Sequence, residues 1–87
     1  MMTDEPVADI TLDLTGLKCP LPVLKARRAI KDMSSGGMIE VLADDPAAEL
    51  DFAHFCETGH HELIETEKSS RPDDGVILRF LIKVGAK

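Results

Sequence analysis

Residues 10 to 22 read ITLDLTGLKCPLP, and this stretch places a cysteine where a β-strand gives way to a helix. Residues 10 to 14 alternate apolar and polar side chains, which is typical of a half-buried strand. A turn then leads to Cys19, and apolar residues recur at helical spacing beyond it. Because proline is favoured at the first position of a helix, we expect the helix to begin at Pro20 and Cys19 to be its N-cap.

The predicted position of Cys19 favours a reactive thiol. The positive end of the helix dipole stabilises a thiolate, which is the nucleophilic form of cysteine. Pro22 has no N–H group, so the N–H groups of Leu21 and Val23 are the nearest donors to the sulfur. The alternative is a small buried hydrophobe, since free cysteines are commonly buried. Two prolines around Leu21 are hard to explain by packing alone, and we therefore expect a reactive Cys19 on a stiff turn.

The periodicity of the whole chain predicts a βαβαββ order. Asp45 is expected to cap the second helix, with Pro46 at its first position, and Gly59 to end it. A parallel crossover followed by an antiparallel hairpin gives an α+β two-layer sandwich, in which a mixed four-stranded sheet carries both helices on one face. The expected strands cover residues 10–14, 38–43, 61–67 and 76–84, the expected helices residues 20–33 and 46–59, and the expected last loop residues 68–75.

Length and composition predict one globular domain. The chain has 87 residues, of which 44% are hydrophobic. We expect residues 1–7 to be a flexible tail and residues 8–87 to form the single domain. The N-terminus lacks the basic and apolar segments of a secretory signal, and no apolar stretch is long enough to span a membrane. With two cysteines in such a chain, we expect a cytoplasmic protein that does not associate with membranes.

Charge is distributed unevenly along the sequence. The net charge is −6, yet residues 14–31 contain five basic residues and no acidic one. Cations near a helix C-terminus are ordinarily favourable, which explains only part of this pattern. We expect Lys18, Lys25 and Arg28 to form a docking surface that steers an acidic partner toward the cysteine. Arg27 is expected at the edge of the buried helix face, with its stem packed.

Three motifs together resemble the TusA/SirA family of small bacterial sulfur carriers. They are Gly-Leu-Lys-Cys-Pro-x-Pro-Val at residues 16–23, Ala-Asp-Asp-Pro-Ala at residues 43–47, and Phe-Cys-x-x-x-His at residues 55–60, and the match extends over about residues 9 to 84. The resemblance implies strand order 1-2-4-3. It also implies a sulfurtransferase without a cofactor, whose Cys19 bears a persulfide and is positioned by the motif residues Gly16, Pro20, Leu21 and Pro22.

The same resemblance implies protein partners. A cysteine desulfurase would donate the sulfur, and a downstream protein would accept it. The leading use is 2-thiouridine modification of transfer RNA, with other sulfur pathways close behind.

Other functions remain as alternatives. Cys56 lies on the apolar face of the second helix, which predicts a core residue, but a thiol–disulfide redox protein using Cys19 and Cys56 is the second hypothesis. A nucleic-acid-binding module is the third, although the negative net charge and the lack of aromatic residues among the basic ones disfavour direct nucleic-acid binding. No metal is expected, because His60 and His61 would point to opposite faces of a strand.

Overall fold

Six elements follow one another in the computed structural model, which describes residues 8 to 72 and 75 to 85. Their bounds are β1 (Ile10–Asp13), α1 (Leu21–Lys31), β2 (Met38–Ala43), α2 (Ala48–Gly59), β3 (Glu62–Ser70) and β4 (Val76–Lys83). The predicted βαβαββ order is confirmed. The tail expected over residues 1 to 7 lies outside the described residues.

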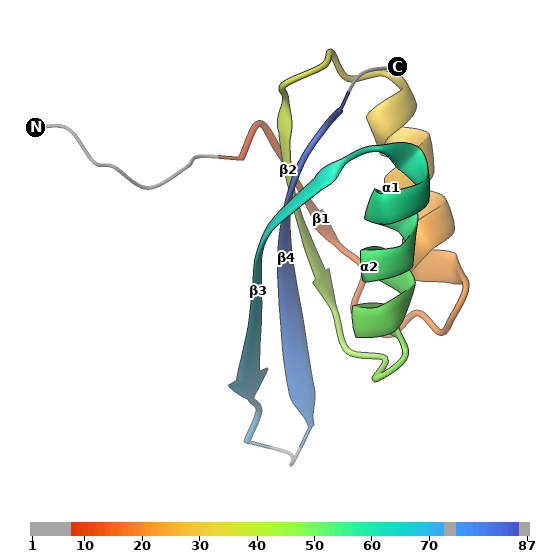
Figure 1. Ribbon diagram of the computed structural model, residues 1–87. Helices are drawn as coiled ribbons and strands as arrows, with labels where there is room; N and C mark the ends of the chain where they lie inside the picture. The colour runs from red at the N-terminus through yellow and green to blue at the C-terminus, as the bar shows by residue number, and fades with distance from the viewer. Residues whose placement is uncertain (1–7, 73–74, 86–87) are drawn as a thin grey trace, which may run out of the picture.

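The strands form one sheet, and both helices cover the same face of it (Figure 1). The strand order is β1-β2-β4-β3, with β1 parallel to β2 and the other neighbours antiparallel. This confirms the order 1-2-4-3 and the two-layer α+β architecture. Because both helices lie on one side, α1 and α2 run next to each other and leave the other face of the sheet open.

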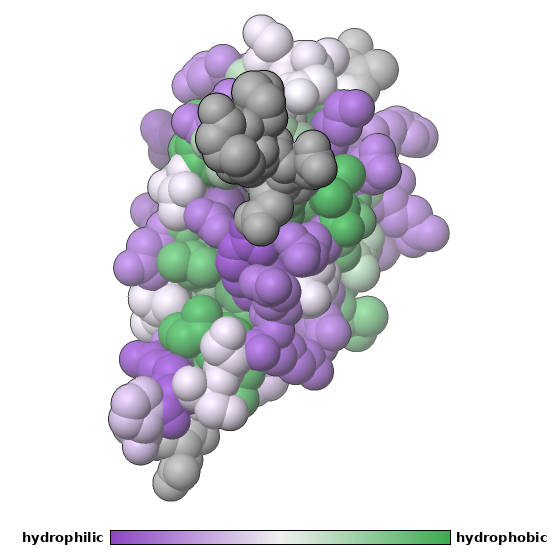
Figure 2. Space-filling model, turned by 90° about the vertical axis from the view of Figure 1, so that its left-hand side faces the viewer, coloured by the Kyte–Doolittle hydropathy of each residue, from purple (hydrophilic) through white to green (hydrophobic). Residues whose placement is uncertain are grey.

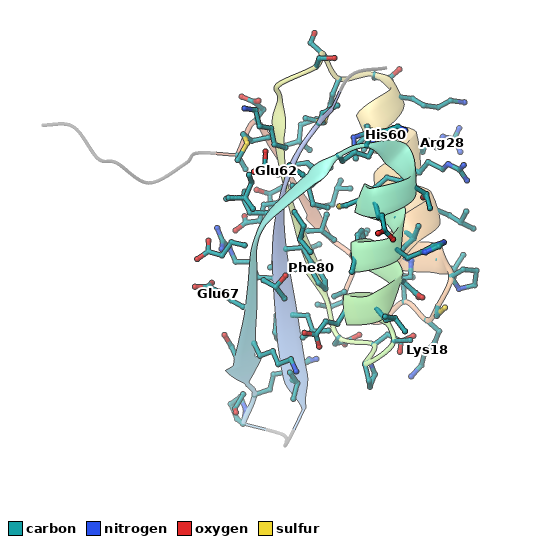
Figure 3. All side chains as sticks on the ribbon, viewed as in Figure 1. Lys18, Arg28, His60, Glu62, Glu67 and Phe80 are labelled. Carbon is teal, nitrogen blue, oxygen red and sulfur yellow. The ribbon has the colours of Figure 1, made fainter. Side chains whose placement is uncertain are left out.

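The core lies between the sheet and the helices and is mostly aliphatic. Its aromatic centre is the pair of Phe52 and Phe80, whose ring centroids are 4.8 Å apart in a stacked arrangement. Figure 3 shows Phe80 between the sheet and the helix layer. Cys56 belongs to this core and is only 3% exposed. The apolar face predicted for the second helix is therefore largely confirmed, and Leu50, which lies off that face, is 76% exposed.

A polar network crosses the open face of the sheet. Arg79 on β4 donates hydrogen bonds to Glu40 on β2 and to Glu65 and Glu67 on β3, the last two at 3.1 and 3.2 Å. Hydrophilic residues accordingly run across this face in Figure 2. The arginine thus joins three strands through one guanidinium group, and its carboxylate neighbours raise its pKa.

Several predicted boundaries are wrong. The first helix begins at Leu21 rather than at Pro20, and the second begins at Ala48 rather than at Pro46. The third strand continues to Ser70, through residues expected to form a loop, because Lys68, Ser69 and Ser70 pair with β4. Pairing with a neighbouring strand outweighs the weak strand preference of such polar residues.

The end of the second helix also differs from the prediction. His60 follows Gly59 as the C-cap, in the left-handed conformation with φ 62°. His61 lies between this cap and β3, and its Nδ1 accepts a hydrogen bond from the Gly85 N–H at 3.0 Å. Neither histidine is on a strand, so the expectation of opposite strand faces is wrong. None of the helices in the described ranges has the length and apolar character needed to cross a membrane.

Candidate functional site

Cys19 lies in a tight turn just before α1. The Leu21 N–H donates to the Lys18 carbonyl at 2.8 Å and closes this turn, and the Cys19–Pro20 peptide is cis. Pro20 is the N-cap of α1, so Cys19 is one residue outside the position predicted for it. Leu21 is also wrongly expected to offer its N–H to the sulfur, because the turn uses that donor. The side chain of Cys19 is exposed.

Asp45, in the connection between β2 and α2, holds the backbone of this turn. Its Oδ2 accepts a hydrogen bond from the Cys19 N–H at 2.6 Å, and its Oδ1 accepts one from the Ala47 N–H at 3.0 Å. The Cys19 bond and then the Ala47 bond lower the pKa of Asp45. Asp45 is therefore not the N-cap of α2, which is Ala47. The carboxylate instead joins the cysteine turn to the start of the second helix.

Asp44, the residue immediately before Asp45, has a similar role. Its Oδ1 accepts a hydrogen bond from the Gly16 N–H at 2.9 Å, and its Oδ2 accepts one from Arg71 at 3.0 Å. Gly16 has φ 87°, a left-handed conformation that favours glycine. The motif residue Gly16 thus has a defined structural task, and the Asp44–Asp45 pair positions both ends of the turn that presents Cys19.

The electrostatic surroundings of the thiol differ from those predicted. A hydrogen bond to the side chain of Asp51, on α2, raises the pKa of the Cys19 thiol, with further contributions from desolvation and from the charges of Asp51 and Asp45. The expectation of a lowered pKa is therefore wrong. The carboxylates of Asp51, on α2, and of Asp45, before α2, disfavour the thiolate, and Cys19 is not at the N-cap position where the dipole of α1 acts most strongly.

Cys19 lies at the end of a groove between α1 and α2, with a volume of about 610 Å³. Besides the cysteine, α1 and its N-cap contribute Pro20, Val23 and Arg27, and α2 contributes Leu50, Asp51, His54 and Phe55. Arg27 is exposed and lines the groove together with the buried Phe55, so the packing of its stem stays a prediction. The four-residue spacing of Cys19, Val23 and Arg27 is the sequence signal for the α1 side of the groove.

The other predicted site residues are distributed around the turn and α1. Lys18 is exposed beside Cys19, Pro22 is buried, and Leu21 is exposed on the first turn of α1. Lys25 and Arg28 line a different groove, of about 450 Å³, between α1 and β1. Figure 3 shows Lys18 and Arg28 near opposite ends of α1. The three predicted docking residues therefore do not gather around the sulfur.

Comparison with known proteins places this chain in a family. The family model described as "Sulfurtransferase TusA" matches residues 10 to 84. This chain belongs to the TusA family. The assignment confirms the resemblance drawn from the motifs, and it supports a role in sulfur relay. In this TusA family member, Cys19 lies at the rim of the groove between α1 and α2.

A solved structure shows the same fold. The SirA-like protein from Desulfitobacterium hafniense is 22% identical in sequence and superposes with a TM-score of 0.62, over 88% of this chain and 99% of that chain.

Within residues 8–72 and 75–85, no three histidine, cysteine or carboxylate side chains come together as a potential metal site.

Proposed function

We propose that Cys19 carries sulfur as a persulfide from a cysteine desulfurase to a downstream acceptor protein, with residues 8–87 as the carrier domain. The observation that carries the proposal is the contrast between the two thiols. Cys19 is exposed on a turn held by Asp45, whereas Cys56 is buried in the core. The most suitable use is 2-thiouridine modification of transfer RNA in the cytoplasm, where thiols stay reduced.

The transfer is a displacement at sulfur. The Cys19 thiolate attacks the outer sulfur of the donor persulfide, an S–S bond forms to Cys19, and the donor thiolate leaves with the electron pair of the broken bond. The thiol proton of Cys19 reaches the donor thiolate through solvent, so oxidation states balance without a further oxidant. The acceptor thiolate then attacks the same outer sulfur and releases Cys19. No cofactor takes part in this scheme.

Asp51 sets the resting state of the carrier. Because Asp51 raises the thiol pKa, the empty carrier favours the less reactive protonated form of Cys19. Arrival of a partner shields the thiol from Asp51 or supplies a cation next to the sulfur. Reactivity then depends on docking, which protects the free carrier from unspecific oxidation.

Lys18, Lys25 and Arg28 act in the encounter rather than at the sulfur. They are exposed cations around the turn and along the outer side of α1. Cations in this arrangement attract an acidic partner over a distance of about a Debye length and raise the association rate. Direct nucleic-acid binding forms no part of the proposed role.

The experiment incubates the protein with a cysteine desulfurase and isotopically labelled cysteine, and intact mass spectrometry counts added sulfur atoms. The wild type and Cys56→Ala are expected to gain one labelled sulfur, and Cys19→Ser none. A Cys19→Ser protein that carries sulfur on Cys56 at the wild-type level would refute the assignment. Burial of Cys56 also weighs against the redox alternative, which requires both thiols to meet.

A further inference from the structure

Two adjoining hollows lie between α1 and α2, and the first of them contains Cys19. A second hollow, of about 470 Å³, adjoins the first and shares Arg27 and Phe55 with it. Its far end is lined by Lys31 on α1 and by His61 after α2. Cys19 is thus the terminal residue of a long surface channel rather than the centre of a small pocket.

The dimensions of the channel match an extended peptide. Arg27 lies eight residues beyond Cys19 and mostly along a helix, which corresponds to about 12 Å at 1.5 Å per residue. An extended chain advances about 3.3 Å per residue, so about four peptide residues cover the same distance. When the cysteine of such a peptide contacts Cys19, the peptide side chain four residues away therefore lies next to Arg27.

The walls of the channel between these two points combine apolar side chains with His54 and Thr58 on α2. Val23 on α1 and Phe55 on α2 line it from both sides, and Leu50, the residue before Asp51, lines the same groove as Cys19. Leu50 is 76% exposed, the largest exposed fraction among the large apolar side chains described. Contact with an apolar side chain of a bound segment would remove this surface from water.

Charge changes sign along the channel. Asp51 is the carboxylate next to the thiol, whereas Arg27 lies about two helical turns farther on. Within residues 8–72 and 75–85, Arg27 forms no ion pair, so its charge is available to a ligand. A ligand with a carboxylate beside its cysteine meets repulsion from Asp51, and one with a carboxylate four residues away meets Arg27.

We propose that this channel binds an extended segment of the sulfur-exchanging partner, in which an apolar residue lies next to the reactive cysteine and a carboxylate lies four residues from it. The inference rests on the proposed function, because it assumes that the partner presents a cysteine to Cys19. A second copy of this chain does not fit the description. Residues 15 to 23 contain no carboxylate, and Cys56 is buried.

The test uses short synthetic peptides and no partner enzyme. Each peptide contains one cysteine, activated as a mixed disulfide with pyridine-2-thiol, and a neighbouring leucine. Attack by the Cys19 thiolate on the peptide sulfur forms a protein–peptide disulfide and releases pyridine-2-thione, whose absorbance gives the rate. One pair of peptides has aspartate four residues before or after cysteine. A second pair has the same composition with aspartate adjacent to cysteine.

We expect the wild type to react about twofold to fivefold faster with the better of the four-residue peptides than with its adjacent-aspartate isomer at low salt, as for one exposed ion pair. Arg27→Gln abolishes this ratio, and Arg27→Lys keeps most of it. Arg28→Gln removes the same charge from the neighbouring position, outside the channel, and keeps the ratio even if both rates fall. High salt reduces the ratio for the wild type.

Leucine in the peptide supplies an independent comparison. Leu50→Gln lowers the rate advantage of leucine over serine next to the peptide cysteine, whereas Leu24→Gln, on an exposed residue of α1 outside the channel, preserves it. The inference would be overturned if the wild type reacted equally fast with the aspartate isomers. It would also be overturned if Arg28→Gln lost the rate ratio between these isomers as completely as Arg27→Gln. Sulfur loading from a desulfurase is measured separately, so failure of the channel and failure of the persulfide role are distinguishable.

Discussion

Replacing Cys56 with alanine is expected to lower the stability of the protein at neutral pH while sulfur loading of Cys19 continues. The side chain is 3% exposed and packs in the aromatic part of the core with Phe52 and Phe55. Removing its sulfur atom leaves a small cavity, and the free energy of unfolding should fall by about 1 kcal/mol. For a domain of this size, the melting temperature then falls by about 4 to 8 °C.

The same substitution should change the response to alkaline pH. Burial raises the pKa of the Cys56 thiol from 9.0 to about 11, so the unfolded chain loses this proton at lower pH than the folded protein. The resulting stabilisation is complete below pH 9 and is lost as the pH rises through 11. Two pH units correspond to about 2 to 3 kcal/mol. The wild type should therefore lose its advantage over Cys56→Ala in this window and become the less stable of the two near its upper end.

Urea unfolding of both proteins under reducing conditions, at several pH values from 7 to above 11, measures this difference directly. Lysine and other alkaline groups titrate in both proteins and cancel in the comparison. If the free energies of unfolding of the two proteins change with pH by the same amount, the Cys56 thiol is not shielded in the core. Loss of sulfur loading in a Cys56→Ala protein that is still folded would show that this thiol takes part in the chemistry.

Two further predictions concern the surroundings of Cys19. Asp51→Asn should lower the pKa of the Cys19 thiol, because it removes the carboxylate that raises it, and the midpoint of alkylation rate against pH should move down; an unchanged midpoint would mean that Asp51 does not control the thiol. Reversing the charges of Lys25 and Arg28 together should leave stability within about ±0.5 kcal/mol. It should slow sulfur transfer from the desulfurase at low salt, with a smaller defect at high salt; equal rates at low salt would reduce these cations to an ordinary solvated surface.

The fold could largely be predicted from local patterns. Alternation along β1 and β4 identifies the strands, and Phe52, Phe55 and Cys56 mark the buried face of α2. The limits of this approach appear at β3, where Lys68 to Ser70 extend the strand only because β4 lies beside them. The strand order came from the family resemblance, since periodicity does not tell which strands are neighbours.

The candidate site was predicted less completely, because its main contacts connect distant parts of the sequence. Asp45 fits a local pattern for helix capping, yet it binds the Cys19 N–H across 26 positions. No local sequence pattern connects Asp51 with Cys19. Asp51 nevertheless raises the pKa of the Cys19 thiol, which the helix dipole is expected to lower. Helical spacing places Arg27 at the edge of the buried face of α1, but it does not show that α2 lines the same groove.

The two hydrogen bonds that Asp45 accepts also affect local unfolding of the protein. A carboxylate that holds the Cys19 N–H and the Ala47 N–H together makes the cysteine turn and the beginning of α2 one cooperative unit for local unfolding. Amide hydrogen exchange at these two residues should therefore proceed through a shared opening event with similar protection. A carrier built in this way meets its partner with the sulfur already in place, and the conformational entropy of ordering that turn is lost during folding rather than at each encounter.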